Sequence, residues 1–275
     1  MRKIISNITK HILLIILCFL TFYPLLFTII TSFKDNEQFY KSFWSLPNPL
    51  VWGNYKDAFT SIMPYVVNSL LVSFLSILFI LIISSLSAYA FARISFPFKE
   101  FIFTMIIALL MIPGILTLIP RYMLMKNFHL LDTYSSLIFN YVAGGQAFAI
   151  FVIRSFLEGQ PKELFEAARI DGSNEFQAFT KIAVPLCKPI LGTVAITNLL
   201  GIWNDYLWPM IVLSGEEKYT ISLGLLKYQS TIQGAVRRFG PEFAGYVVAS
   251  LPLIILFFIL MDQFLEGMTA GAIKA

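Results

Sequence analysis

The residues that could carry covalent or metal chemistry form no recognisable constellation in this chain. Its two cysteines, Cys18 and Cys187, make no C-x-x-C pair, and its two histidines, His11 and His129, make no H-E-x-x-H pair. A G-x-S-x-G nucleophile motif is absent, and no Gly-Lys pair occurs, so the phosphate-binding loop G-x-x-x-x-G-K-[ST] is absent too. We therefore expect no catalytic residue, no metal site and no cofactor on this chain.

One polar cluster within an apolar stretch could bind a hydroxylated ligand. Asp205 interrupts the uncharged residues around it and is flanked by Trp203, Asn204 and Tyr206. Aromatic faces suit pyranose rings, whereas Asn and Asp side chains hydrogen-bond to hydroxyls, so this cluster and Asn198 are candidates for a sugar path. The alternatives are an aromatic belt at the membrane interface for residues 203–206 and interhelical hydrogen bonding for Asn198.

The composition indicates a membrane protein. Of 275 residues, 57% are hydrophobic and only 13% are charged, against about 25% charged in an ordinary soluble domain. This balance excludes a cytosolic enzyme and a disordered protein. The net charge of +4 is spread along the chain, so it predicts no nucleic-acid partner.

Stretches with few charges predict six membrane-spanning helices in one domain, 1–275, with both termini on the same side. About 20 apolar residues are needed to cross the hydrocarbon core. Pro113, Gly114 and Pro120 predict a kink in the third helix. Lysine and arginine are nearly balanced between the two sets of loops, so charge alone leaves the orientation open. The expected helices are approximately 11–33, 66–92, 101–120, 133–157, 187–213 and 243–264.

The segment 158–186 predicts two short helices joined by a sharp corner. Asp171-Gly172 is a turn signal, with glycine where a helix end requires a left-handed residue. We expect Ser173 to cap the second helix and Pro185 to end it. The apolar residues of both helices recur with helical periodicity, so one face must be covered. Periodicity alone allows either the protein's own membrane helices and lipid headgroups or a soluble partner with a groove.

Three motifs resemble those of one transporter family. The run EAARIDGSNEFQAFTKIAVPLCKP, which begins at Glu166, resembles the EAA motif of ABC-transporter permeases. The run WNDYLWP, from Trp203 to Pro209, and the C-terminal EGMTAGAIKA, from Glu266, resemble the MalG-type subunit of carbohydrate importers. The chain is also similar to that group in length and helix layout.

This resemblance implies an all-α integral membrane protein with six transmembrane helices and a coupling loop between helices 4 and 5. The loop would enter a cleft of a cytoplasmic ATPase and receive a rigid-body push when the ATPase dimer closes. The protein would then be a multi-pass protein of the bacterial inner membrane with both termini in the cytoplasm. The residues that match the motif, and that we expect to couple the ATPase to the membrane helices, are Glu166, Ala167, Ala168, Asp171, Gly172, Phe176 and Phe179.

The resemblance also implies partners and a function. ATP and Mg would be held by the ATPase dimer, while a second homologous permease would complete a heterodimer and an extracytoplasmic binding protein would deliver the sugar. The segment from Ser214 to Glu242 is a candidate surface for that binding protein, or a solvated loop. The expected function is half of the translocation path of a binding-protein-dependent, ATP-driven sugar importer.

Two alternatives to sugar import remain at this stage. One is an ABC permease for another solute, such as a phosphate ester or a peptide. The other is an ion-coupled secondary transporter, which would require several ionisable residues in the spans and an inverted repeat. Apart from Asp262, at the end of the last expected helix, Asp205 is the one acid within the expected spans, and we find no repeat.

Overall fold

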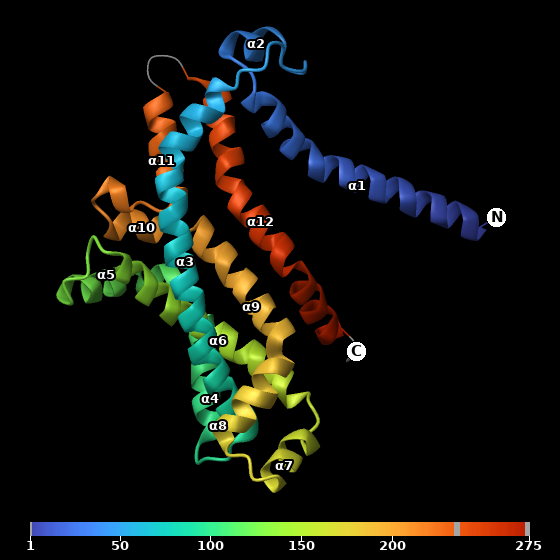
Figure 1. The fold of residues 1–275 in the computed structure, drawn as a ribbon, viewed down its shortest axis with the longest axis vertical. Helices are drawn as coiled ribbons and strands as arrows, with labels where there is room; N and C mark the ends of the chain where they lie inside the picture. Colours follow the sequence, from blue (N-terminus) through green and yellow to red (C-terminus); the bar gives the residue numbers. More distant parts are fainter. Residues whose placement is uncertain (1, 234–236, 273–275) are drawn as a thin grey trace. The chain divides into compact units, whose positions relative to one another are not determined.

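The chain is described from a computed structural model, which defines residues 2–233 and 237–272. These residues form helices and turns and contain no strand (Figure 1). They fall into two compact units, which are described separately. Unit 1 comprises Met1–Val66 and Gly224–Pro252, and unit 2 comprises Val67–Leu223 and Leu253–Ala275.

Within the described residues, five helices are long and apolar enough to cross a membrane, and a bent pair of helices passes the same test when the two are counted as one span. This confirms the expected all-α membrane fold. The bounds differ in detail from the expectation, since the second span begins at Gly53 rather than near residue 66. The long helices are α1 (Arg2–Ser32), α3 (Gly53–Arg93), α6 (Tyr134–Glu158), α9 (Val184–Asn204) and α12 (Phe239–Ala272).

The third span is sharply broken, as its prolines predict. The segments Lys99–Met111 and Gly114–Asn127 meet at an angle of 95°. Pro113 lacks an amide hydrogen and forces the preceding Ile112 into an extended conformation (φ −82°, ψ 114°), which ends the first segment. Pro120 lies in the first turn of α5 (Leu118–Asn127), where a missing amide hydrogen is tolerated. The chain therefore turns at residues 112–113 and not at Pro120.

The expected helix 187–213 is interrupted at Asp205. This residue is extended (φ −73°, ψ 119°), and its Oδ1 accepts hydrogen bonds from the amides of Leu207 and Trp208. An aspartate side chain competes with the backbone for these amide hydrogens, so it ends α9 and begins α10 (Leu207–Val212). The following segment, expected to be a loop, contains α11 (Ile221–Ile232).

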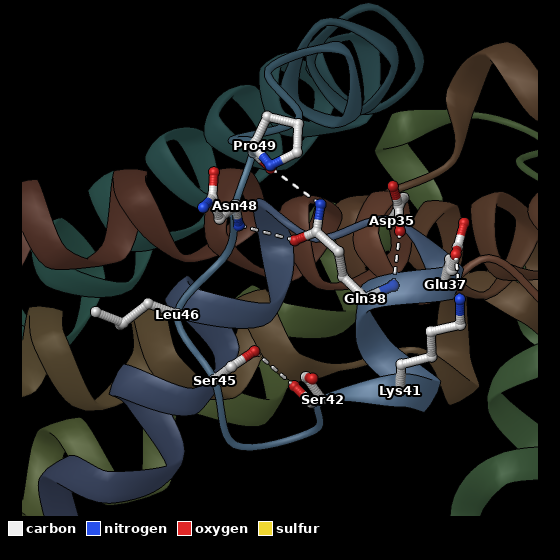
Figure 2. A pocket seen from close by; sticks show the side chains of 9 residues that line it. All are labelled: Asp35, Glu37, Gln38, Lys41, Ser42, Ser45, Leu46, Asn48 and Pro49. Carbon is white, nitrogen blue, oxygen red and sulfur yellow. Dashed lines mark hydrogen bonds and ion pairs between the residues drawn. The ribbon is translucent and has the colours of Figure 1, made fainter.

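In unit 1, the loop after α1 folds around a buried cation. Lys34 is fully buried, and its Nζ donates hydrogen bonds to the carbonyls of Ser42 (3.0 Å) and Phe43 (2.9 Å). Figure 2 shows Gln38 of α2 (Asn36–Lys41) bonded across the loop to the amide of Asn48 and the carbonyl of Pro49. Gln38, Asn48 and Pro49 are among the residues that line a polar cavity of about 490 Å³. The loop is therefore a folded cap rather than an unstructured linker.

In unit 2, Asp132 joins the turn before α6 to the segment after α10. Its Oδ1 accepts hydrogen bonds from the amides of Ser214 and Gly215 (3.0 Å each), and its Oδ2 accepts one from Lys218 Nζ (2.6 Å). Lys218 and these two amides lower the pKa of Asp132 to about 2. The carboxylate is therefore ionised throughout the physiological range and holds the two segments together.

We expect Asp132→Asn to loosen the segment 213–219 at neutral pH. Because the folded-state pKa lies below the ordinary value near 4, the ionised carboxylate stabilises this contact above about pH 4 and loses that effect as the pH falls towards 2. Proteolytic cleavage within 213–219 should be faster in the variant than in the wild type at pH 7, and equal in both with pepsin at pH 2. Equal rates at pH 7 would contradict this role for Asp132.

Candidate functional site

The corner expected in segment 158–186 is present in unit 2. Helix α7 (Glu163–Ile170) is followed by Asp171 and then by Gly172, whose φ is +83°. The amides of Gly172 and Ser173 donate to the carbonyls of Arg169 (3.1 Å) and Ala168 (2.9 Å), a glycine-terminated helix end. The prediction of a left-handed glycine at 172 is confirmed. A Cβ at this position would meet no atom within 4 Å, so only the backbone conformation disfavours a larger residue.

Two details of the second helix differ from the expectation. Its N-cap is Asn174 rather than Ser173, because Asn174 and Gln177 exchange side chain–backbone hydrogen bonds in a capping box. Pro185 does not end the helix. Helix α8 (Glu175–Ala178) continues through a π-turn, Phe179–Ala183, into α9, and Pro185 lies in the first turn of α9 where it is tolerated.

One face of the corner packs into the protein's own core. Phe165, Ala168 and Ala178 are each at least nine-tenths buried, and Phe165 and Ala178 join a cluster with residues of α3, α6 and α9. Phe179 is half-buried against the same cluster. This face is therefore covered by the protein's own helices, which is the first of the two possibilities that the periodicity allowed.

The other face of the corner is open. Ile170 is 86% exposed, Phe176 69% and Leu164 45%, and these three side chains are called the corner patch. Glu166, Ala167 and Asp171 are exposed as well. Figure 1 shows α7 and α8 at the end of unit 2 where α3 turns into α4 (Lys99–Ala108). Large apolar side chains exposed on a protruding corner are typical of a docking surface.

Arg93, at the end of α3, binds the chain on both sides of Gly159. Its Nη2 donates hydrogen bonds to the carbonyl of Leu157, in the last turn of α6, and to the carbonyl of Gln160, just after α6. Its guanidinium also lies 4.2 Å from the centre of the Phe165 ring, over the aromatic face. Carbonyls at a helix end have no partner within the helix, so Arg93 satisfies them while it positions α7.

A second contact joins both helices of the corner to α3. Tyr89 on α3 donates a hydrogen bond to Glu175 Oε2 (2.7 Å), and Arg169 Nε of α7 donates one to Glu175 Oε1 (2.9 Å). The bond to Glu175 raises the pKa of Arg169 above its ordinary value, so the pair stays charged. Motion of the corner would therefore be passed to α3. Tyr89 and Glu175 are 86 residues apart, so no sequence spacing predicts their contact.

A polar cavity of about 510 Å³ lies between α5, α6 and α9 in unit 2. On α6 and α9 its lining residues recur at helical spacing, so each helix turns one polar, glycine-containing face towards it. Of the residues expected in a sugar path, Asn198, Asn204 and Asp205 line the cavity. Trp203 is buried and Tyr206 half-exposed, and both lie outside this lining. The lining residues are Arg121, Asn140, Tyr141, Gly144, Gly145, Thr197, Asn198, Gly201, Ile202, Asn204 and Asp205.

The charged groups of this cavity are held by neutral partners. Arg121 donates to Asn140 Oδ1 (2.8 Å) and to the carbonyls of Gly114 and Thr117, and Tyr141 donates its hydroxyl to Asp205 Oδ2 (3.0 Å). Arg121 is not among the site residues expected from the sequence, because the third helix was expected to end at Pro120, whereas α5 continues to Asn127. Within the described part of the chain, no three acidic, histidine or cysteine side chains gather to hold a metal.

Comparison with known proteins identifies one family. Residues 80–269 match the family described as the binding-protein-dependent transport system inner membrane component. The chain is similar to the diacetylchitobiose uptake system permease protein NgcG of Streptomyces coelicolor, with 30% identity over 96% of this chain and 88% of that protein. It is 32% identical, over the full length of both chains, to the arabinooligosaccharides transport system permease protein AraQ of Halalkalibacterium halodurans.

A solved structure supports the fold. A chain of a bacterial ABC transporter involved in the import of the acidic polysaccharide alginate superposes with a TM-score of 0.83, covering 94% of this chain and 96% of that chain. Its sequence identity is 22%, so the similarity establishes the arrangement of helices.

Glu175→Gln should loosen the corner, and Glu166→Gln in the same loop is the matched control. The first variant loses the ion pair with Arg169, whereas no hydrogen bond or ion pair joins the Glu166 side chain to any described residue. Both carboxylates are exposed, so we expect a cost of about 1 kcal/mol for Glu175→Gln. Amide exchange across residues 165–178, measured by mass spectrometry, should accelerate about fivefold. The same rate in both variants would contradict the structural role of Glu175.

Proposed function

We propose that this chain is the permease subunit of an ATP-driven sugar importer. It belongs to the family of binding-protein-dependent transport system inner membrane components. Family membership and several long apolar helices make it a multi-pass membrane protein and a transporter subunit. The relatives that it resembles over nearly their whole length carry names that specify diacetylchitobiose and arabinooligosaccharide transport. A sugar or oligosaccharide is therefore the proposed substrate.

The two-sided corner is the observation that carries this proposal. Its inner face packs among α3, α6 and α9, and its outer face presents the corner patch to a partner. A partner that displaced the corner would move the membrane helices with it, because Arg93 and Glu175 join the corner to α3. The chain has no phosphate-binding loop, so we assign ATP hydrolysis, with ATP and Mg, to separate ATPase subunits.

The coupling residues divide into two groups by exposure. Glu166, Ala167, Asp171 and Phe176 are exposed and would contact the ATPase, with the small Ala167 allowing a close approach. Ala168 and Phe179 are buried or half-buried and would transmit the displacement inwards. Gly172 sets the angle between the two helices through its positive φ.

The remaining partners and the orientation follow from this assignment. The corner and both termini would lie in the bacterial cytoplasm, and a second homologous permease would complete a heterodimer. A binding protein would dock on the opposite side, where Ser214 to Glu242 is our candidate surface. Asn198, Asn204 and Asp205 would line the sugar path through the polar cavity. An ion-coupled transporter would need no ATPase, so co-purification of an ATPase separates the two classes.

Gly172→Val should uncouple the transporter while leaving membrane insertion normal. A β-branched residue is strongly disfavoured at φ +83°, so the corner must change its angle. Substrate-stimulated ATP turnover, measured in the reconstituted complex with its binding protein, should fall to the unstimulated rate. Ser173→Val is the matched control, since it adds a β-branched side chain at the next residue, where φ is not positive. Normal stimulation in Gly172→Val would overturn the coupling role of this residue.

Ile170→Ser should weaken retention of the ATPase. Replacing one exposed apolar side chain at the centre of a docking surface costs about 1–3 kcal/mol of binding. Affinity purification of the tagged permease should therefore recover at least fivefold less ATPase from this variant. Trp44→Ser is the control, because Trp44 is 74% exposed in the loop expected on the other side of the membrane. Equal recovery from Ile170→Ser and Trp44→Ser would exclude the corner patch as the contact.

A further inference from the structure

We propose that a groove between α3 and α9 in unit 2 binds an anionic phospholipid. The acyl chain would lie in the groove, and the phosphate would contact Lys181 and Lys188. This inference rests on the proposed function only for the position of the corner at the cytoplasmic face of the membrane. It adds a lipid partner, which sugar import by itself does not require.

Two adjoining apolar pockets form the groove. The one nearer the corner has a volume of about 370 Å³, its neighbour has a volume of about 450 Å³, and Leu81 of α3 lines both. Their lining on α3 begins at Leu70 and ends at Leu86, a length of about 24 Å at the rise of an α-helix. One leaflet contributes about half of a hydrocarbon core of roughly 30 Å. The groove is therefore long enough for an acyl chain that enters from the corner side.

Lys188 lies within the apolar stripe that α9 turns towards the groove. Val184 and Leu191, which line the groove, are four residues before and three residues after Lys188, so the three share one helix face. The Cα–Cβ bonds of a helix tilt towards its N-terminus, which for α9 is the end joined to the corner. The Lys188 ammonium can thus extend towards the corner while its methylene groups cover apolar surface.

The groove carries positive charge that the described residues leave uncompensated. Lys188 on α9 and Lys181 in the π-turn before it are both exposed. No hydrogen bond or ion pair joins either ammonium to any residue that the structure describes. An anionic headgroup would supply the missing charge, and each lysine near such a headgroup strengthens binding about fivefold. Apolar groove and unpaired lysines together match the two parts of an anionic phospholipid.

A helix of the partner permease is the other occupant that an apolar groove could hold. An apolar helix packed on this stripe would cover Lys188 without neutralising it, and an uncompensated charge is costly to remove from water. The small side chains of Ser73, Ser85 and Ala195 leave indentations along the groove, which a flexible acyl chain can follow. We therefore assign the groove to a lipid.

The test is native mass spectrometry of the purified complex of this chain, its partner permease and the ATPase. Dioleoyl phosphatidylglycerol and dioleoyl phosphatidylcholine, which have the same acyl chains, are titrated as anionic and zwitterionic probes. The double variant Lys181→Gln/Lys188→Gln removes the headgroup contacts, and Ala195→Phe fills the groove. The matched controls are Lys162→Gln, at an exposed lysine of the same loop, and Ala143→Phe, at an exposed alanine of α6 outside the groove lining.

We expect the wild type and both controls to bind phosphatidylglycerol more tightly than phosphatidylcholine. The double lysine variant should weaken phosphatidylglycerol binding by about tenfold or more and abolish this preference. Ala195→Phe should weaken binding of both lipids, because it blocks the acyl chain that they share.

Equal binding of the two lipids by the wild type, or wild-type binding by the double lysine variant, would overturn the lipid site. Loss of the partner permease from the Ala195→Phe complex with unchanged lipid binding would overturn it too, since the groove would then be a helix interface. Absence of an ATPase from the wild-type complex would instead contradict the proposed function, and the same spectra would still report lipid binding.

Discussion

The structure depends on one constraint: a helix that is broken or ended at membrane depth leaves backbone groups that must find a partner within the protein. Each of the three main interruptions in unit 2 has a charged side chain at that point. Arg121 donates hydrogen bonds to carbonyls at the break in the third span, and Arg93 donates hydrogen bonds to carbonyls at the end of α6. Asp205 accepts hydrogen bonds from amides at the start of α10. These three charged residues thus hydrogen-bond to backbone groups that have no partner within their own helix.

The same residues then define the functional sites, because a break is also where a helix surface opens. Arg121 and Asp205 line the polar cavity together with Asn198 and Asn204, and neutral groups hydrogen-bond to both charged side chains. Arg93 lies over Phe165 and thereby connects α6 to the corner. The side chains that hydrogen-bond to the interrupted backbone therefore also form part of the cavity and of the corner.

The corner combines a rigid inner face with an accessible outer face. Phe165 is buried, and Glu175 is bonded to both α3 and α7, so the inner face of the corner is attached to α3. Ile170 and Phe176 remain exposed although they are large and apolar, which is unfavourable for an isolated chain and appropriate for a subunit of a complex. Under the proposed function, this division would let a force on the outer face reach the inner face without a change in local fold.

Features with local causes could be predicted from the amino-acid sequence: the all-α membrane class, the long apolar helices, the break beside Pro113 and the positive φ of Gly172. Composition, proline chemistry and glycine's lack of a Cβ act over a few residues, so they can be interpreted without a fold. The contact of Tyr89 with Glu175 and the cavity shared by Arg121 and Asn198 became visible in the folded chain, since these residues are distant in sequence. It also separated Asn204 from Trp203, because the helix face, and not adjacency in the chain, determines which side chain enters a cavity.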